Sequence, residues 1–295
     1  KDTASKLDAS SFLYAGRRYR GTFTVLSDGS VVNTVGLEEY LQSVVSREMP
    51  ASWPQAALQT QAIVARTFVL QRSTPRRSYD LVPSEADQVY TGIDAENGAT
   101  TAAVKSTNGQ VLRFADGFAS VMYSSCCGGH TEASSEAWGG PSLPYLGGVT
   151  CPYCSDSPWY RWTQNIPVDR LRTGMGDRLQ TIGNIRNITA ERPDPSGRIR
   201  FATIIGESGS VRIKGADLRR ALGMRMMPSL LVRKLTVNAV QDPASQAEPT
   251  LTIEGGGLGH GVGLCQWGAR GFAHTGASAS AILAFYYPGT TIGND

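Results

Sequence analysis

The chain has 295 residues, of which 41% are hydrophobic and 18% are charged, as is typical of globular proteins that bury a sizeable core. A net charge of +3 is a weak basic bias. Without a Lys/Arg run or an aromatic stacking motif, it argues against nucleic acid as a partner and favours a mildly anionic polymer. The apolar runs are too short to cross a bilayer.

The N-terminal part predicts a polar segment followed by a β-hairpin. Residues 1–18 are treated as a polar N-terminal segment. Residues 18–26 and 30–35 alternate between apolar and polar side chains, and Asp28-Gly29 between them is a strong turn signal. We therefore expect a strand–turn–strand unit before the first helix.

Residues 36–72 predict two helices separated by a short break. One apolar stripe marks the first helix, formed by Leu37, Tyr40, Leu41, Val44 and Val45. Pro50 ends this helix, because the residue before a proline avoids helical geometry. The second helix is expected to begin with a capping box at Ser52 and Gln55. It is apolar on nearly all sides from 56 to 70, which predicts that it is buried.

Three polar side chains in this pair are candidates for a site. Glu48 falls in the last turn of the first helix, at the negative end of the helix dipole, where the protonated acid is favoured. Gln61 and Arg66 interrupt the apolar second helix. They are either hydrogen-bonded core groups or side chains that reach into a cleft beside Glu48, and the pattern leaves both interpretations open.

The rest of the chain predicts mainly strands. A helix is expected at 95–106, and a hairpin at 110–114 and 118–124 around an Asp-Gly turn. Further strands are expected at 181–192, 198–206, 210–214 and 230–240, beside a short helix at 216–222.

These patterns predict the α+β fold class, with a helical pair packed on mixed β-strands and a β-rich second lobe. Residues 19–162 would form the first part of the core, with Glu48 and a cysteine cluster. Residues 163–245 would form the β-rich lobe. Residues 246–295 would complete the core with a Gly-rich substrate loop and a closing C-terminal helix.

The cysteines predict a metal site. Two pairs, Cys127-x-x-His130 and Cys151-x-x-Cys154, have the spacing of a structural zinc site. Such a closed set of ligands would hold loops together rather than take part in a reaction. Cys126 is the alternative first ligand. An oxidising compartment would instead favour a disulfide between Cys151 and Cys154, or across to Cys126.

A glycine-rich segment at 254–269 carries His260 and Gln266. No Lys-Ser/Thr follows, and the spacing matches neither a P-loop nor a dinucleotide fingerprint, which argues against a phosphate-binding loop. A tight loop that lines a substrate cleft fits better, and a glycine-rich turn between a strand and a closing helix is the alternative. Cys265 has no partner in sequence and is expected to be a small buried residue.

Three stretches together resemble the SpoIID/LytB domain family, named after stage II sporulation protein D. They are LEEYLQSVVSREMPASWPQAALQTQAIVARTF, YSSCCGGHTE with the CPYC that follows it, and GGGLGHGVGLCQWGARGFA with ILAFYYPGT beyond it. The resemblance extends from about residue 19 to residue 291. Cys265 departs from the pattern, in which we expect Ser.

The resemblance implies a function. The family includes lytic transglycosylases that cut peptidoglycan glycan strands, especially strands stripped of stem peptides, and proteins described as enhancers of cell-wall amidases. By resemblance, Glu48 matches the catalytic acid, and the cysteine cluster matches a zinc-type cluster of some members. The resemblance also implies substrate-binding positions at Gln61, Arg66, Tyr123, Ser124, Ser125, His260 and Gln266.

The carboxylates agree with this interpretation. A hydrolytic glycosidase uses a pair of carboxyl groups, whereas here only Glu48 has a distinctive setting. The others lack a matching context: Glu39, Glu132, Glu136 and Glu254. A single Glu suffices if the 6-hydroxyl of N-acetylmuramic acid (MurNAc) attacks C1, breaks the bond to N-acetylglucosamine (GlcNAc) and leaves a 1,6-anhydro end.

The sequence therefore predicts a lytic transglycosylase, a lyase of peptidoglycan glycan strands. The alternative is a non-catalytic glycan-binding module that stimulates a cell-wall amidase. A zinc hydrolase is a third interpretation, but a fourth protein ligand would leave no open coordination position. We expect an extracytoplasmic protein, in the cell envelope or secreted. Because the chain begins with Lys1 rather than Met, we expect a trimmed or processed form from which any signal peptide or membrane anchor is already missing.

Overall fold

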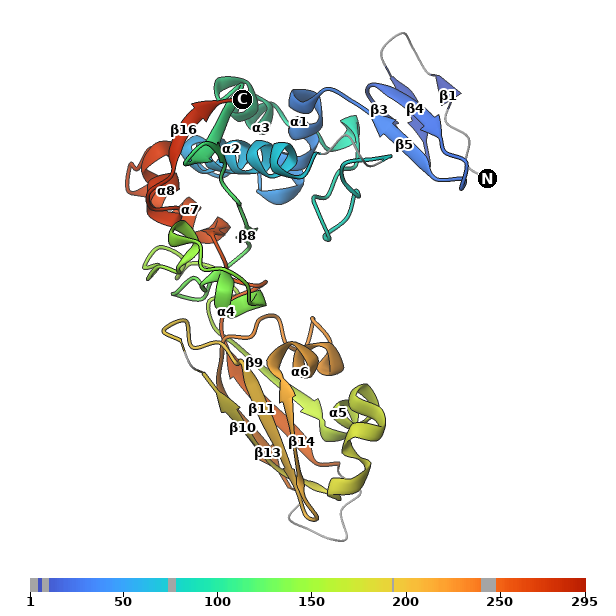
Figure 1. Ribbon diagram of the computed structural model, residues 1–295, viewed down its shortest axis with the longest axis vertical. Helices are drawn as coiled ribbons and strands as arrows, with labels where there is room; N and C mark the ends of the chain where they lie inside the picture. The colour runs from blue at the N-terminus through green and yellow to red at the C-terminus, as the bar shows by residue number, and fades with distance from the viewer. Residues whose placement is uncertain (1–4, 7–10, 74–77, 193, 240–247) are drawn as a thin grey trace. The chain divides into compact units, whose positions relative to one another are not determined.

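The computed structural model describes residues 5–6, 11–73, 78–192, 194–239 and 248–295 (Figure 1). Helices and small sheets both contribute, which confirms the predicted α+β class. The chain divides into two compact units. Unit 1 consists of Lys1–Met122, Phe272–Phe285 and Gly289–Asp295. Unit 2 consists of Tyr123–Gly271 and Tyr286–Pro288.

Unit 1 begins with two small antiparallel sheets. The first contains β1 (Ser5–Lys6), β2 (Phe12–Tyr14) and β3 (Arg17–Tyr19), and the second contains β4 (Thr22–Val25) and β5 (Val31–Thr34). The hairpin predicted around Asp28-Gly29 is confirmed, but its first strand is shorter than 18–26. Gly21 interrupts it with a φ of +80°, where an added Cβ would lie 1.9 Å from the carbonyl oxygen of Thr34.

The predicted helical pair is confirmed as α1 (Leu37–Glu48) and α2 (Gln55–Arg72). The capping box was a wrong prediction, because Pro54 occupies the N-cap position of α2 and makes no side-chain cap hydrogen bond. The two helices share a buried cluster with residues further along the chain: Leu41, Val44, Val45, Ala62, Ala65, Tyr90 and Val104.

The rest of unit 1 surrounds this pair. A 3₁₀ turn at Ile93–Ala95 is followed by α3 (Gly98–Ser106), β6 (Gln110–Phe114) and β7 (Gly117–Phe118). The C-terminal strand β16 (Thr291–Asn294) pairs with β6, so the last strand of the chain completes this sheet. The predicted strand at 118–124 is divided, because β7 ends at Phe118 and a separate β8 (Tyr123–Ser124) pairs elsewhere.

Unit 2 contains two three-stranded antiparallel sheets, which Figure 1 shows beside two helices. One sheet has the order β13 (Val232–Asn238), β14 (Thr250–Gly255), β9 (Trp162–Pro167). The other has the order β10 (Ile185–Glu191), β11 (Phe201–Gly206), β12 (Ser210–Lys214). The helices are α5 (Val168–Met175) and α6 (Gly215–Leu222).

The strand predictions for this lobe hold at 210–214 and are shortened elsewhere. The first of them begins late because Gly176–Ile182 is a 3₁₀ helix and β10 starts only at Ile185. The predicted strand at 230–240 extends to residue 240, which lies outside the described residues, and β13 ends at Asn238. Apolar side chains from both sheets and both helices form one core that includes Ile166, Leu171, Ile204, Leu218, Val232 and Ile253.

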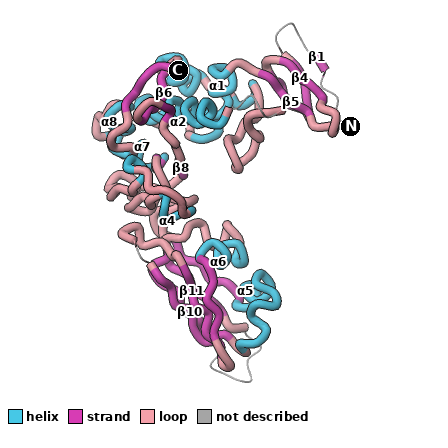
Figure 2. Tube along the Cα trace, viewed as in Figure 1, coloured by secondary structure: helices cyan, strands magenta, loops and turns pink. Residues whose placement is uncertain are grey.

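Between β8 and β9 the chain consists mainly of loops (Figure 2). They contain the short helix α4 (Ser134–Trp138) and a 3₁₀ turn at Pro144–Leu146. Further along, β15 (Leu264–Cys265) leads into α7 (Gln266–His274), and α8 (Ala279–Tyr286) follows. Among the described residues, no helix has both the length and the apolar composition that a bilayer crossing requires.

Candidate functional site

Glu48 is the last residue of α1, in unit 1. The helix stops there because Met49 has an extended backbone and is followed by Pro50. The carboxyl group is therefore at the negative end of the helix dipole, as predicted, and the residue is half-buried. A half-buried acid at this position has access to a ligand and little help from the helix in staying ionised, which suits a proton donor.

Arg66 is completely buried in α2 and holds several elements of unit 1 together. Its Nε and Nη2 donate to the two carboxylate oxygens of Glu38 at 2.6 and 2.8 Å, and Nη1 donates to the Gln110 carbonyl at 2.9 Å. A weaker contact joins Nη2 to the Val104 carbonyl at 3.4 Å. Of the two interpretations left open by the sequence, this geometry favours a hydrogen-bonded core group. Gln61, also in α2, has no exposed surface either.

Two segments lie side by side in unit 2. One is the glycine-rich segment at 254–269, and the other is the cysteine-rich segment at 123–132, which contains Cys126 and Cys127. Strands β8 and β15 pair in parallel, and isolated bridges join Cys126 to Leu258 and Glu132 to Val262. Glycine is needed at Gly259, where a Cβ would lie 2.9 Å from the Cβ of Ser124. Close packing against the segment that contains Ser124 therefore accounts for the glycine at this position.

His260 is held within this loop as a neutral imidazole. Its Nδ1 accepts a hydrogen bond from the backbone N–H of Val262 at 3.0 Å, so the proton is on Nε2. Burial lowers the pKa of His260 to about 4, although a hydrogen bond with the backbone of Tyr123 acts in the opposite direction. The ring of Trp138, a 56% exposed side chain on α4, lies 5.1 Å from it. A neutral His260 can orient a ligand by hydrogen bonding but is a weak partner for an anion.

The other predicted substrate-binding residues of unit 2 lie around the same two segments. The hydroxyl of Ser124 accepts a hydrogen bond from the N–H of Gly261 at 3.2 Å. The carbonyl of Ser125 accepts from the N–H of Trp267 at 3.0 Å. Tyr123 is half-buried in β8, and Gln266, which is 6% exposed, begins α7.

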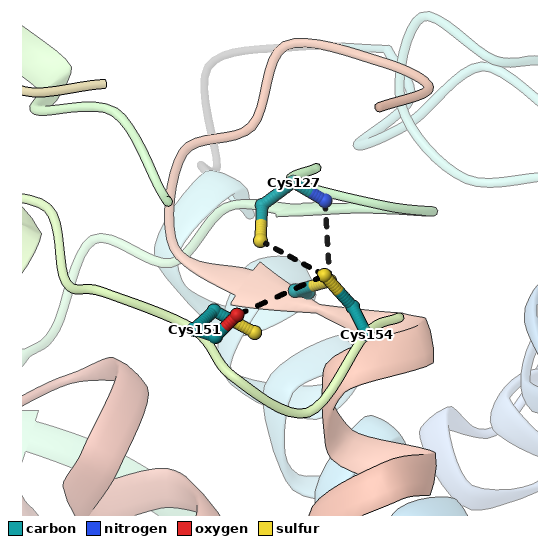
Figure 3. A group of neighbouring side chains, drawn as sticks. Cys127, Cys151 and Cys154 are labelled. Carbon is teal, nitrogen blue, oxygen red and sulfur yellow. Dashed lines mark hydrogen bonds between the residues drawn. The ribbon is translucent and has the colours of Figure 1, made fainter. Parts of the chain in front are cut away.

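Four buried cysteines converge in unit 2: Cys127, Cys151, Cys154 and Cys265. Their sulfur atoms all lie within 4.8 Å of one another, and those of Cys127 and Cys154 are 3.6 Å apart. Four thiolates around one zinc ion at 2.3 Å would be separated by about 3.8 Å, so the donor set fits a tetrahedral metal site. Figure 3 shows Cys127 on one loop and Cys151 with Cys154 on another.

Hydrogen-bond donors surround these sulfur atoms. The Sγ of Cys265 accepts from the backbone N–H of Cys127 at 3.2 Å and from that of Gly268 at 3.3 Å. The hydroxyl of Tyr286 lies 3.1 Å from the Sγ of Cys151. Donors of this kind stabilise metal-bound thiolates. All five cysteines of the chain carry free thiols, so none of the disulfide alternatives is formed.

The cluster differs from the predicted ligand set at one position. His130 is not in it, since its Nδ1 lies 2.6 Å from the carbonyl oxygen of Thr131, and Cys265 takes the fourth place. Cys126, the alternative first ligand, is buried, and its backbone pairs with Leu258. Spacing could not identify Cys265, because it follows Cys127 by 138 residues and belongs to no short Cys motif. The sequence feature that could have pointed to Cys265 as a ligand was the cysteine at a position where the family pattern has Ser.

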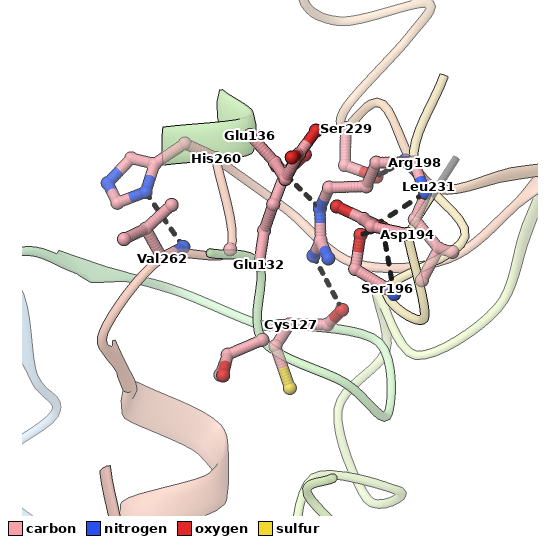
Figure 4. Close-up of polar contacts among 12 residues, drawn as sticks. Cys127, Glu132, Glu136, Asp194, Ser196, Arg198, Ser229, Leu231, His260 and Val262 are labelled. Carbon is pink, nitrogen blue, oxygen red and sulfur yellow. Dashed lines mark hydrogen bonds and ion pairs between the residues drawn. The ribbon is translucent and has the colours of Figure 1, made fainter. Parts of the chain in front are cut away.

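Arg198 connects the cysteine-rich segment to a turn of the β-rich lobe (Figure 4). It is 2% exposed, and its Nη2 and Nη1 donate to the carbonyls of Cys127 and His130 at 2.8 and 3.0 Å. Its Nε lies 3.6 Å from the carboxylate of Glu132. Burial raises the pKa of Glu132 to about 7, although the Arg198 charge opposes the rise. Sequence reasoning missed this pair, because Arg198 is one of many arginines in the lobe.

The predicted site residues are thus divided between the units. Glu48, Gln61 and Arg66 belong to unit 1, whereas His260, Gln266, the serines and the cysteines belong to unit 2. The expected meeting of Glu48 with the loops of unit 2 at one cleft stays a prediction.

Comparison with known proteins identifies the family. Residues 27–114, which include Glu48, match the family model described as Stage II sporulation protein (SpoIID). "Stage II sporulation protein D" of Bacillus subtilis strain 168 is 30% identical over 278 residues, covering 88% of this chain and 75% of that protein. Its counterpart in Bacillus amyloliquefaciens is 31% identical with the same coverage. The chain belongs to the SpoIID family.

Two further matches extend this result. The "Amidase enhancer" of Bacillus subtilis strain 168 is 30% identical to this SpoIID chain over 293 residues, covering 85% of the chain but only 40% of the enhancer. Residues 153–263 match a domain of unknown function, DUF8618. The region that matches this domain contains Cys154, Arg198 and His260. Cys127 and Cys265 lie outside both this region and the region that matches the SpoIID model.

Proposed function

We propose that this SpoIID-family protein is a lytic transglycosylase that cuts the MurNAc–GlcNAc bond of peptidoglycan glycan strands, with Glu48 as its only acid/base. The observation that carries the proposal is the position of Glu48 as the half-buried last residue of α1, within the segment that matches the SpoIID model. Strands stripped of stem peptides are the proposed substrates, in keeping with the resemblance to the family.

In the proposed reaction, Glu48 is protonated at the start. Its carboxyl group donates the proton to the glycosidic oxygen as the bond from C1 of MurNAc to that oxygen breaks. The resulting carboxylate accepts the proton of the MurNAc 6-hydroxyl as O6 attacks C1. The products are a strand with a 1,6-anhydro-MurNAc end and a strand with a free GlcNAc hydroxyl. Glu48 ends protonated, and no water is consumed.

We further propose that Cys127, Cys151, Cys154 and Cys265 hold a structural zinc ion. The support is the donor set itself: four buried thiols within 4.8 Å, with N–H and O–H donors against two of them. A bound zinc ion would cross-link the loops that carry these cysteines. Its role would be structural, because four protein ligands leave no position for a substrate or water. The reaction at Glu48 needs no cofactor.

The second candidate function is stimulation of a cell-wall amidase without cleavage of glycan. The match to a protein named amidase enhancer favours it, although the chain covers only 40% of that protein. A cell-wall amidase is then the proposed partner, and glycan binding would position it. Either function places the protein at the cell wall, so we propose an extracytoplasmic location.

Products released from peptide-free glycan strands distinguish the two functions. Mass spectrometry of the digest should detect 1,6-anhydro-MurNAc ends with the unaltered protein and none with Glu48→Gln. The matched control is Glu39→Gln, because Glu39 is in the first turn of the same helix and its side chain is 48% exposed. Reducing ends in place of anhydro ends would indicate a hydrolase. Binding without cleavage by either protein would favour the amidase enhancer.

A further inference from the structure

Unit 1 contains a pocket of about 640 Å³ that no role described above uses. It is formed by the N-terminal sheets, the beginning of α1, the end of α2 and residues 78–83. Its aromatic lining consists of Tyr14, Tyr19, Phe23, Tyr40, Tyr79 and Tyr90. A volume of this size accommodates a ligand of several rings.

Five of these six aromatic rings, all except Tyr79, form a continuous series of ring contacts along the pocket. The ring of Phe23 lies 5.4 Å from that of Tyr14 and 5.5 Å from that of Tyr19. Tyr19 lies 5.7 Å from Tyr90, which in turn lies 4.8 Å from Tyr40 on α1. The series therefore leads from the N-terminal sheets to the helix that ends at Glu48.

Several of these rings are only partly covered by the described part of the chain. Tyr14, Tyr19 and Phe23 are half-buried, and Tyr79 is 48% exposed, one of the few large apolar side chains with so much surface. The hydroxyls of Tyr14, Tyr19 and Tyr79 make no hydrogen bond to another described residue. They are available to a ligand that combines flat apolar faces with hydroxyl groups.

The charge of the lining excludes strongly ionic ligands. Among the described residues that line the pocket there is no Lys, Arg or Glu. Its single carboxylate, Asp80, accepts a hydrogen bond from the hydroxyl of Ser73 at 2.8 Å. An uncharged ring with CH groups on one face and hydroxyl or amide groups at its edge fits this lining better than a phosphate or a peptide ammonium group.

The pocket is also connected to the proposed catalytic acid through α1. Tyr40 and Glu48 are eight residues apart on one helix, a rise of roughly 12 Å. Burial is the main cause of a raised pKa at Tyr40, followed by the charges of Asp87 and Glu48, so Glu48 is within electrostatic range of this phenol. A strand of a few sugar units spans such a distance.

We propose that this pocket is a distal glycan subsite, which binds N-acetylhexosamine units of the same strand that Glu48 cleaves. The aromatic rings stack on the sugar faces, and the tyrosine hydroxyls bind the ring substituents. The choice of glycan rests on the proposed function. The pocket, its partly exposed rings and the composition of its lining do not depend on that function.

Binding of chitohexaose, the β-1,4-linked hexamer of N-acetylglucosamine, to the Glu48→Gln protein tests the proposal. In this background, Tyr79→Ala should weaken binding by roughly three- to tenfold in calorimetric titrations, as expected for loss of one stacked ring. Tyr79→Phe, which keeps the ring and loses only the hydroxyl, should weaken binding less than Tyr79→Ala does. The matched control is Val25→Ala, because Val25 is 69% exposed on β4 and does not line the pocket.

The outcomes separate this proposal from the proposed function. If Tyr79→Ala weakens hexamer binding but the unaltered protein cuts no glycan, the subsite stands and the transglycosylase does not. If the unaltered protein cuts glycan and Tyr79→Ala binds the hexamer with unchanged affinity, the subsite is overturned.

Amide chemical shifts provide a readout without a pocket variant. The hexamer should shift the resonances of Asn33 and Tyr79, and shifts confined to other residues would overturn the subsite.

Discussion

The guanidinium of Arg198 donates a hydrogen bond to the carbonyl of Cys127 at 2.8 Å. The bond joins a turn of the β-rich lobe to the loop that carries the first cysteine of the cluster. A second bond from the same guanidinium reaches the carbonyl of His130, at the far end of the Gly128-Gly129 turn. One buried side chain thus fixes both ends of that turn, and it comes from the region that matches the domain of unknown function.

Arg198→Met should destabilise the protein by about 3 kcal/mol or more, because it leaves Glu132 and two carbonyls buried without their partner. Urea unfolding gives the change in free energy. The matched control is Arg212→Met, since Arg212 pairs with Glu191 on the surface and both side chains are about half exposed. That control should change stability by less than about 1 kcal/mol. Equal effects of the two substitutions would contradict the role given to Arg198.

Glu132 should make the stability depend on pH. Burial raises its folded-state pKa to about 7, above an unfolded value of about 4.3. The folded state then binds the proton more tightly, so the contribution of this group to stability is largest below the unfolded pKa and is lost as the pH rises through 7. Glu132→Gln removes this dependence. Relative to the variant, the unaltered protein should lose about 3 kcal/mol between pH 4.5 and 7.5 in urea unfolding. A constant difference across that range would argue against a raised pKa.

Gly261→Ala should be strongly destabilising. A Cβ there would lie 2.0 Å from Nη2 of Arg198, a buried atom that is held by its hydrogen bond to Cys127, and φ is +80°. We expect a loss of about 3 kcal/mol or more in thermal or urea unfolding. Gly276→Ala is the matched control, because its φ is +91° but no atom lies within 4 Å of the added Cβ. It should cost only about 1 kcal/mol, from backbone strain.

The metal content should distinguish Cys265 from His130 as the fourth ligand. Purified Cys265→Ala should contain substoichiometric zinc by elemental analysis and should lose it readily to a chelator. His130→Ala should retain zinc at the level of the unaltered protein, because His130 is not in the cluster. Cys126→Ala tests the alternative first ligand and should also retain zinc, because Cys126 is not in the cluster. Full zinc in Cys265→Ala together with loss in His130→Ala would restore the ligand set predicted from sequence.

Local patterns in the sequence determined the helical pair and the position of Glu48. The apolar stripe of α1 and the proline at position 50 depend only on near neighbours, so periodicity and backbone sterics were sufficient. The same holds for the hairpin around Asp28-Gly29 and for β12. Where local rules competed with tertiary contacts they failed, as at the N-terminus of α2, which begins without a capping box.

Only the tertiary structure decided which distant residues meet. Cys265 joins the cluster because β15 pairs in parallel with β8, which brings it beside the loop of Cys127. Arg66 proved to be buried and paired with Glu38, which is one of the two roles that the sequence left open. Arg198 binds the loop of Cys127, a role that nothing in its sequence context indicated. Sequence spacing predicts contacts between neighbours along the chain. Contacts between residues that are distant in the sequence depend on strand pairing and core packing, which no short motif encodes.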